Sequence, residues 1–119
     1  MRVVGALGGL VEGLKDRVGA VAAAFVSRDG VVLYASLPSG VPAETYAIMC
    51  ATMYGAAAAA NAELGRSPPE RLVLEGGGVT TIVVGCGPDA LLVAAVDPSP
   101  ELTAIVDELT RTALRLVPA

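Results

Sequence analysis

The chain has 119 residues, enough for one domain with its own core, and we expect a single domain over residues 1–119. Hydrophobic residues make up 54% of the chain, charged residues 17%, and the net charge is −4. The acidic balance disfavours nucleic acid and anionic membrane surfaces as partners, because both attract basic patches. Globular domains typically carry about 25% charged residues, so this chain has few charges to cover its surface and is expected to bury an apolar patch against a partner.

Two cysteines, Cys50 and Cys86, lie far apart in the sequence and show no metal-ligand spacing. We expect both to be buried, reduced thiols that pack as small hydrophobic side chains. Residues 2–17 do not read as a signal peptide, because charges interrupt their apolar pattern. The longest apolar run, residues 47–60, is shorter than the ~18 residues that a membrane span needs. The sequence therefore predicts a cytoplasmic protein without a membrane span.

The first third of the chain predicts one helix and a β-hairpin. Apolar residues recur at helical spacing over residues 2–17. The continuous apolar run of residues 18–27 predicts a strand buried on both faces. Asp29-Gly30 then separates this run from a second one, residues 31–36, and such a dipeptide between apolar runs is a strong hairpin signal.

The rest of the chain predicts a long helix, three strands and a last helix. Residues 43–65 are rich in alanine, the best helix former, and a proline pair follows them. Glycine-rich turns link three apolar segments, which favours an antiparallel meander of strands over residues 72–75, 79–86 and 90–96. Ser99 as N-cap and Pro100 at the first helical position predict where the last helix begins. The predicted order is α-β-β-α-β-β-β-α.

Side chains suited to catalysis are scarce. Histidine is absent, which removes the commonest general base and the commonest metal ligand. The run Gly76-Gly77-Gly78 lacks the lysine and the Ser/Thr of a phosphate-binding loop, and we interpret it as a hairpin turn. No pair of carboxylates stands out as an acid/base couple. We therefore predict that the chain is not an enzyme and holds neither a metal nor another cofactor.

The helix predicted over residues 43–65 has no charge between Glu44 and Glu63. A helix that is apolar on every side should be buried on every side, and one sheet covers only one of them. We expect the sheet-facing side to be Tyr46, Met49, Cys50, Met53, Ala57, Ala60 and Leu64. We expect the opposite side to meet a twofold copy of the chain through Ile48, Ala51, Gly55, Ala58, Ala59 and Ala62, with Thr52 at its flank. The alternative is that alanine serves here only as a helix former.

The strand predicted over residues 72–75 follows the proline pair and has one neighbour along the chain. We interpret it as a candidate sheet edge, and edge strands pair readily with other strands. Two such edges meeting antiparallel would join two sheets into one. Leu72, Val73 and Leu74 are accordingly predicted to lie at an interface between chains.

Three segments carry a resemblance to a known family: AAFVSRDGVVLYASLP, AETYAIMCATMYGAAAAANAELG and ERLVLEGGGVTTIVVGCGPDALLVAAVDPSPELTAIVDEL. Together they resemble the Roadblock/dynein light chain family, which includes the bacterial polarity regulator MglB. The resemblance implies an α/β (α+β) sandwich with a five-stranded antiparallel sheet, the second helix on one face and the terminal helices on the other. It also implies homodimers or heterodimers in which middle strands pair and second helices lie side by side.

The same resemblance implies a function, because family members regulate or scaffold small Ras-like GTPases and some are dynein subunits. We expect a non-catalytic homodimer that binds a small Ras-like GTPase and modulates its nucleotide cycle or localisation; a paralogous Roadblock-like subunit is a further possible partner. Two alternatives stay open: a purely structural assembly subunit, and a sensor with a small molecule between helix and sheet. Arg66 and Arg71 could act in trans as arginine fingers, although solvated loop arginines are the simpler interpretation.

Overall fold

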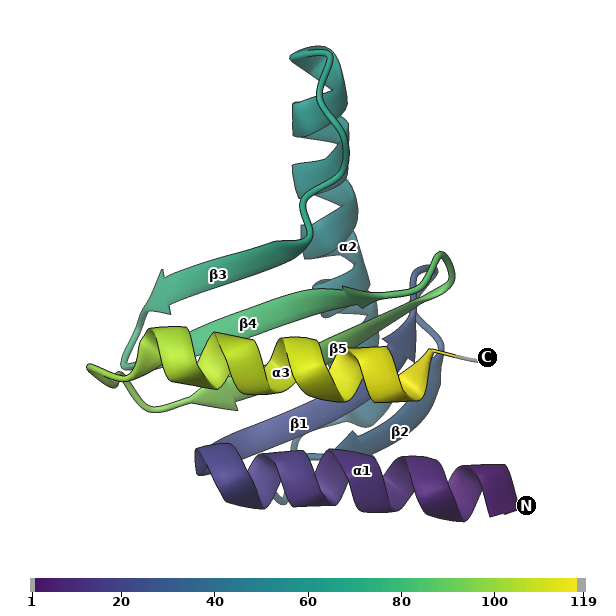
Figure 1. Ribbon diagram of the computed structural model, residues 1–119, viewed down its shortest axis with the longest axis vertical. Coiled ribbons are helices and arrows are strands. Elements are labelled where there is room, and N and C mark those ends of the chain that lie inside the picture. Colours follow the sequence, from purple (N-terminus) through teal and green to yellow (C-terminus); the bar gives the residue numbers. More distant parts are fainter. Residues whose placement is uncertain (1, 118–119) are drawn as a thin grey trace.

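Three helices and five strands follow one another in the predicted order (Figure 1). The computed structural model describes residues 2–117, and the side chains of residues 5–117. The elements are α1 (Arg2–Val18), β1 (Ala20–Ser27), β2 (Val32–Ser36), α2 (Ala43–Glu63), β3 (Arg71–Gly76), β4 (Val79–Cys86), β5 (Ala90–Val96) and α3 (Leu102–Leu116).

The five strands form one antiparallel sheet in the order β2-β1-β5-β4-β3. The predicted hairpin joins β1 to β2, and its turn closes with a hydrogen bond of 3.0 Å from the Gly30 amide to the Ser27 carbonyl oxygen. Gly30 has a φ of 94°, a conformation that side chains disfavour. β3 lies at one edge of the sheet, as its sequence position predicted, and β2 lies at the other.

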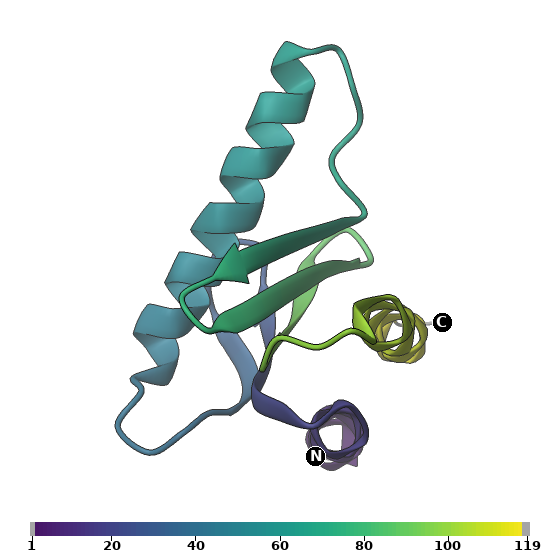
Figure 2. The ribbon, with the colours of Figure 1, turned by 90° about the vertical axis from the view of Figure 1, so that its left-hand side faces the viewer.

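Each face of the sheet carries its own hydrophobic core (Figure 2). α1 and α3 cover one face, where Leu14 and Leu109 pack against residues such as Leu92. α2 covers the opposite face, where Cys50 packs among residues that include Val93. β5 is buried along its whole length, and its successive side chains alternate between the two cores. The predicted sandwich, with one helix on one face and the terminal helices on the other, is confirmed.

Several element boundaries differ from the prediction by one to three residues, and two of these differences have a clear local cause. β1 begins at Ala20 and not at residue 18, because Gly19 turns the chain out of α1 with a φ of 65°. α3 begins at Leu102, after the predicted start at Ser99. The Ser99 hydroxyl accepts a hydrogen bond of 3.0 Å from the Glu101 amide in a turn that precedes the helix, and the first helical bond is accepted by the Glu101 carbonyl oxygen.

Candidate interaction surface

Only the first half of α2 lies on the sheet, and the second half projects beyond the sheet (Figures 1 and 2). The four buried residues of α2 all lie before Gly55: Ala47, Cys50, Ala51 and Tyr54. Past them Ala58 still packs against the core, but the helix then loses its cover, and Leu64 at its C-cap is 75% exposed. A long apolar helix therefore stands partly in solvent.

The predicted orientation of α2 was wrong for several residues. Met49, expected to face the sheet, is 59% exposed, whereas Ala51, expected to face a partner, is only 8% exposed. Ala58 is also half-buried and packs against the core on this face of the sheet. The small side chains of Ala47 and Ala51 let the helix approach the strands closely. A helix that is apolar on every side offers no polar face from which its orientation can be predicted.

The outward side of α2 carries an exposed row of side chains, which we call the helix strip. Its members share one side of the helix and are small or apolar apart from one threonine: Ile48, Met49, Thr52, Gly55, Ala56, Ala59 and Ala62. The Thr52 hydroxyl donates a hydrogen bond of 2.7 Å to the Ile48 carbonyl oxygen, so this group is already satisfied within the helix. No member of the strip has an ionisable side chain, so the strip offers packing contacts and no acid or base.

Tyr46 and Cys50, two ionisable side chains on α2, stay neutral at neutral pH. Burial raises the pKa of Tyr46 to about 12, and the neighbouring Cys50 adds to this shift. Burial likewise raises the pKa of the Cys50 thiol, although a hydrogen bond with Tyr46 opposes the change. Charge on α2 is therefore limited to Glu44 and Glu63, near its two ends.

The edge strand β3 supplies the second predicted contact. Its residues pair with β4 on one side only, with Leu72 opposite Val83. Leu72 is half-buried and packs in the core beneath α2, whereas Leu74, two residues further on the same face, is 49% exposed. Val73 points to the opposite face and is also exposed. The outer edge of β3 thus offers backbone groups and apolar side chains together.

Hydrogen bonds from side chains and from the backbone hold the loop between α2 and β3. The Asn61 side-chain amide donates a hydrogen bond of 3.0 Å to the Ser67 backbone carbonyl oxygen. The Arg66 backbone N–H donates one of 2.8 Å to the Asn61 backbone carbonyl oxygen. The buried Tyr54 hydroxyl donates to the Pro69 carbonyl oxygen at 2.7 Å. Tyr54 is not among the site residues predicted from sequence; the signal that could have found it is that a buried tyrosine hydroxyl needs a hydrogen-bond partner.

The two candidate arginine fingers lie outside the helix strip. Arg66 is exposed in the loop, and Arg71 begins β3 with its Nη1 3.6 Å from Glu70 Oε1. Within the described side chains, no three histidine, cysteine, aspartate or glutamate residues gather as a set of metal ligands. None of the helices in the described part of the chain is both long and apolar enough to cross a bilayer.

Comparison with known proteins relates this chain to one domain family. A family model described as the Roadblock/LC7 domain matches residues 8–95. The protein MJ0714 of Methanocaldococcus jannaschii is 31% identical over 112 residues, which cover 87% of this chain and 94% of that protein. A solved structure of MglB with a tetrameric arrangement has a TM-score of 0.87 at 25% identity, covering 96% of this chain and 87% of that one. Myxococcus xanthus MglB has a TM-score of 0.85 at 14% identity, covering 91% of this chain and 89% of that one. At this identity the similarity shows the fold alone.

Proposed function

Since the chain belongs to the Roadblock/LC7 domain family, we propose that it is a cytoplasmic, non-catalytic module that pairs with a second copy of itself and binds a small Ras-like GTPase. In this proposal the paired chains modulate the nucleotide cycle or the localisation of the GTPase. The resemblance found in the sequence supports such a partner, because members of the family regulate or scaffold GTPases of this class. The observation that carries the proposal is the helix strip, an uncharged surface that a single chain leaves in solvent.

Two features of one chain support pairing with a second copy. Gly55 and Ala59 in the helix strip are small enough for another helix to approach closely. The open edge of β3 can pair antiparallel with β3 of a second chain. The proposed contacts are the predicted residues that remain exposed, together with the edge strand: Ile48, Thr52, Gly55, Ala59, Ala62, Leu72, Val73 and Leu74. Ala51 and Ala58 are left out, because they pack against their own sheet.

The mode of action follows from the side chains that the surface offers. A binding partner shifts a conformational equilibrium only through its differential affinity for the two states. The helix strip carries no acid, base or nucleophile apart from the satisfied hydroxyl of Thr52. The paired helices would therefore act on the GTPase by preferring one nucleotide state. A catalytic contribution would have to come from Arg66 or Arg71, and GTP hydrolysis unchanged in Arg66→Ala and Arg71→Ala would remove that role.

The direct test is a pull-down with the small GTPases of the source cell, each loaded with GDP and with a non-hydrolysable GTP analogue. We expect at least one GTPase to bind with a preference for one nucleotide. Ala104→Glu, on the opposite face of the molecule, is the control for Gly55→Glu, since both add one charge at an exposed position. Gly55→Glu should weaken the interaction, and Ala104→Glu should leave it intact.

Failure of every GTPase to bind a stable dimer would reject the GTPase part of the proposal. The chain would then fit the structural assembly subunit that the sequence analysis left open. A paralogous subunit of the same family would offer the same two surfaces, so a heterodimer would use the same residues. Copurification of such a subunit from the source cell would distinguish the heterodimer from the homodimer.

A further inference from the structure

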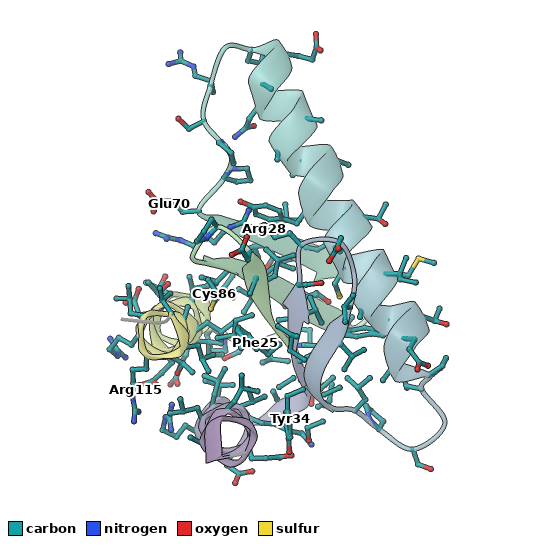
Figure 3. All side chains as sticks on the ribbon, turned by 90° about the vertical axis from the view of Figure 1, so that its right-hand side faces the viewer. Phe25, Arg28, Tyr34, Glu70, Cys86 and Arg115 are labelled. Carbon is teal, nitrogen blue, oxygen red and sulfur yellow. The ribbon has the colours of Figure 1, made fainter. Side chains whose placement is uncertain are left out.

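A cavity of about 350 Å³ opens at the end of the sheet, between α3 and the loop that leads into β3. Most of its wall is apolar: Pro68, Pro69, Val84, Ala113, Leu114 and Val117. The helix strip contributes no residue to it. Arg28, from the turn between β1 and β2, also lines the cavity, and Figure 3 shows it at the same end of the sheet as Glu70.

Two contacts hold the guanidinium group of Arg28 in place, and a glycine leaves room for it. Its Nη2 donates a hydrogen bond of 2.8 Å to the Gly87 carbonyl oxygen. Its central carbon lies 4.9 Å from the centre of the Tyr54 ring, within the range of a cation–π contact. A Cβ built at Gly85 would lie 2.9 Å from Nη2, so the guanidinium occupies space that a side chain at this position would take. Arg28 is therefore positioned before any ligand arrives.

The charge of Arg28 is not neutralised by the described side chains. None of their carboxylates forms an ion pair with it, and its Nε is buried without a hydrogen-bond acceptor. Glu70 also lines the cavity, but its side chain is 89% exposed and faces Arg71 at 3.6 Å. A guanidinium with spare donors thus meets an apolar wall in a chain whose net charge is −4.

The two side-chain hydroxyls in the cavity wall already donate to backbone carbonyl oxygens. The Tyr54 hydroxyl donates to the Pro69 carbonyl oxygen at 2.7 Å. The Thr110 hydroxyl donates to the Val106 carbonyl oxygen at 3.0 Å. Arg71 also lines the cavity, and its charge is partly balanced by Glu70, whose Oε1 lies 3.6 Å from Arg71 Nη1. Arg28 is the guanidinium of this lining without a carboxylate partner among the described side chains, and its planar donor set matches a carboxylate better than a phosphate, whose oxygens need donors on more sides.

We propose that this cavity binds a small carboxylate that carries a hydrocarbon tail. The carboxylate meets the guanidinium of Arg28, and the tail packs against the apolar wall, with Leu114 and Val117 at the α3 side. The volume lies near the lower end of the ~300–1,000 Å³ typical of small-molecule sites, which suits a short aliphatic chain. The proposal goes beyond the pairing and GTPase binding proposed above and depends on neither.

The test is an NMR titration of the ¹⁵N-labelled full chain with hexanoate. Two matched probes share its tail: 1-hexanol, which is neutral, and hexylammonium, which is cationic. We expect saturable shifts for hexanoate at the amides of residues 85–87, with roughly tenfold weaker binding or none for the other two probes. The absence of saturable shifts with hexanoate overturns the proposal. Equal affinity for 1-hexanol also overturns it, because Arg28 would then contribute nothing.

Two variants test the role of Arg28 separately. Arg28→Gln removes the charge, and Gly85→Ala keeps the charge but displaces the guanidinium from its present place. Each should weaken hexanoate binding by roughly tenfold or more. Arg115→Gln, at an exposed position on α3 outside the cavity, should leave binding unchanged. If Arg28→Gln does not fold, the result for Gly85→Ala alone tests the role of Arg28. A folded variant that binds hexanoate with wild-type affinity rejects Arg28 as the carboxylate-binding residue.

Discussion

The hydroxyl of Tyr34 donates a hydrogen bond of 2.5 Å to Oε2 of Glu12, and this contact ties β2 to α1. The Ser36 hydroxyl donates to the other carboxylate oxygen at 3.1 Å. These two bonds, with that of Tyr34 the stronger influence, hold the pKa of Glu12 below its ordinary value. The bond to Glu12 also raises the pKa of Tyr34.

This pair predicts how the stability of the chain depends on pH. A carboxyl group whose pKa is lower in the folded chain stabilises the fold above its unfolded pKa, near 4.3, and loses this effect as the pH falls through the folded pKa. Tyr34→Phe should therefore lower the free energy of unfolding at about pH 7 by more than at about pH 3. Urea unfolding at both pH values measures the difference. In a Glu12→Gln background the effect of Tyr34→Phe should become independent of pH, and a pH-independent effect in the wild-type background contradicts the prediction.

Alanine should be tolerated differently at two adjacent glycines in α1. A Cβ at Gly8 would lie 2.9 Å from Cε1 of Tyr34, whose ring is held by Glu12, whereas a Cβ at Gly9 meets nothing within 4 Å. Gly9→Ala should stabilise the chain by up to about 1 kcal/mol through helix propensity. Gly8→Ala must displace the Tyr34 ring and should be clearly less stable than Gly9→Ala. Thermal unfolding of both variants tests this prediction. Equal stabilisation by the two substitutions would contradict it, because the Tyr34 ring would then move without a cost in stability.

The proposed pairing predicts a concentration-stable dimer that a charge in the helix strip disrupts. Light scattering across a dilution series should give about twice the mass of the 11.9 kDa chain. Gly55→Glu places a charge in the middle of the helix strip and should shift the mass toward the monomer, because an unpaired buried charge is costly. Ala104→Glu should remain dimeric. A wild-type chain that is monomeric at every concentration, or a Gly55→Glu variant as dimeric as the wild type, rules out this interface.

The two thiols should be unreactive in the folded chain. Cys50 is 2% exposed and Cys86 is 4% exposed, and burial raises the pKa of Cys86 to about 11 despite the opposing charge of Arg28. At about pH 8 both thiols should therefore be protonated and shielded from reagents. Titration with a disulfide reagent should detect almost no thiol in the native chain and both after denaturation in urea. Rapid reaction of one thiol before unfolding would contradict this burial.

Most of the fold could be predicted from sequence because its signals are local. The Asp29-Gly30 turn, the proline pair and the glycine-rich links separate the apolar segments, and β4 and β5 have the predicted bounds. The side of α2 that faces the sheet could not be predicted, because α2 lacks the polar face that would mark its solvent-exposed side. Contact with the sheet decides it instead, through the close approach that Ala47 and Ala51 allow.

The cavity lined by Arg28 could not be predicted from the sequence for a different reason. Its polar centre combines a hairpin arginine, a helix tyrosine and two glycines of β4 and its turn, Gly85 and Gly87. Each of these residues has an ordinary local explanation, and only the packing of distant segments brings them together. The exposed positions of the helix strip, by contrast, follow from one helix and were predicted in part.

The alternation along β5 has a consequence for how the molecule comes apart. Leu91 and Val93 belong to the core under α2, whereas Leu92 and Ala94 belong to the core under α1 and α3. If β5 unfolds, both cores lose side chains at the same time. Neither α2 nor the pair α1 and α3 can therefore stay packed on the sheet without the other layer. Unfolding should therefore be cooperative, with helix and sheet signals lost in one transition.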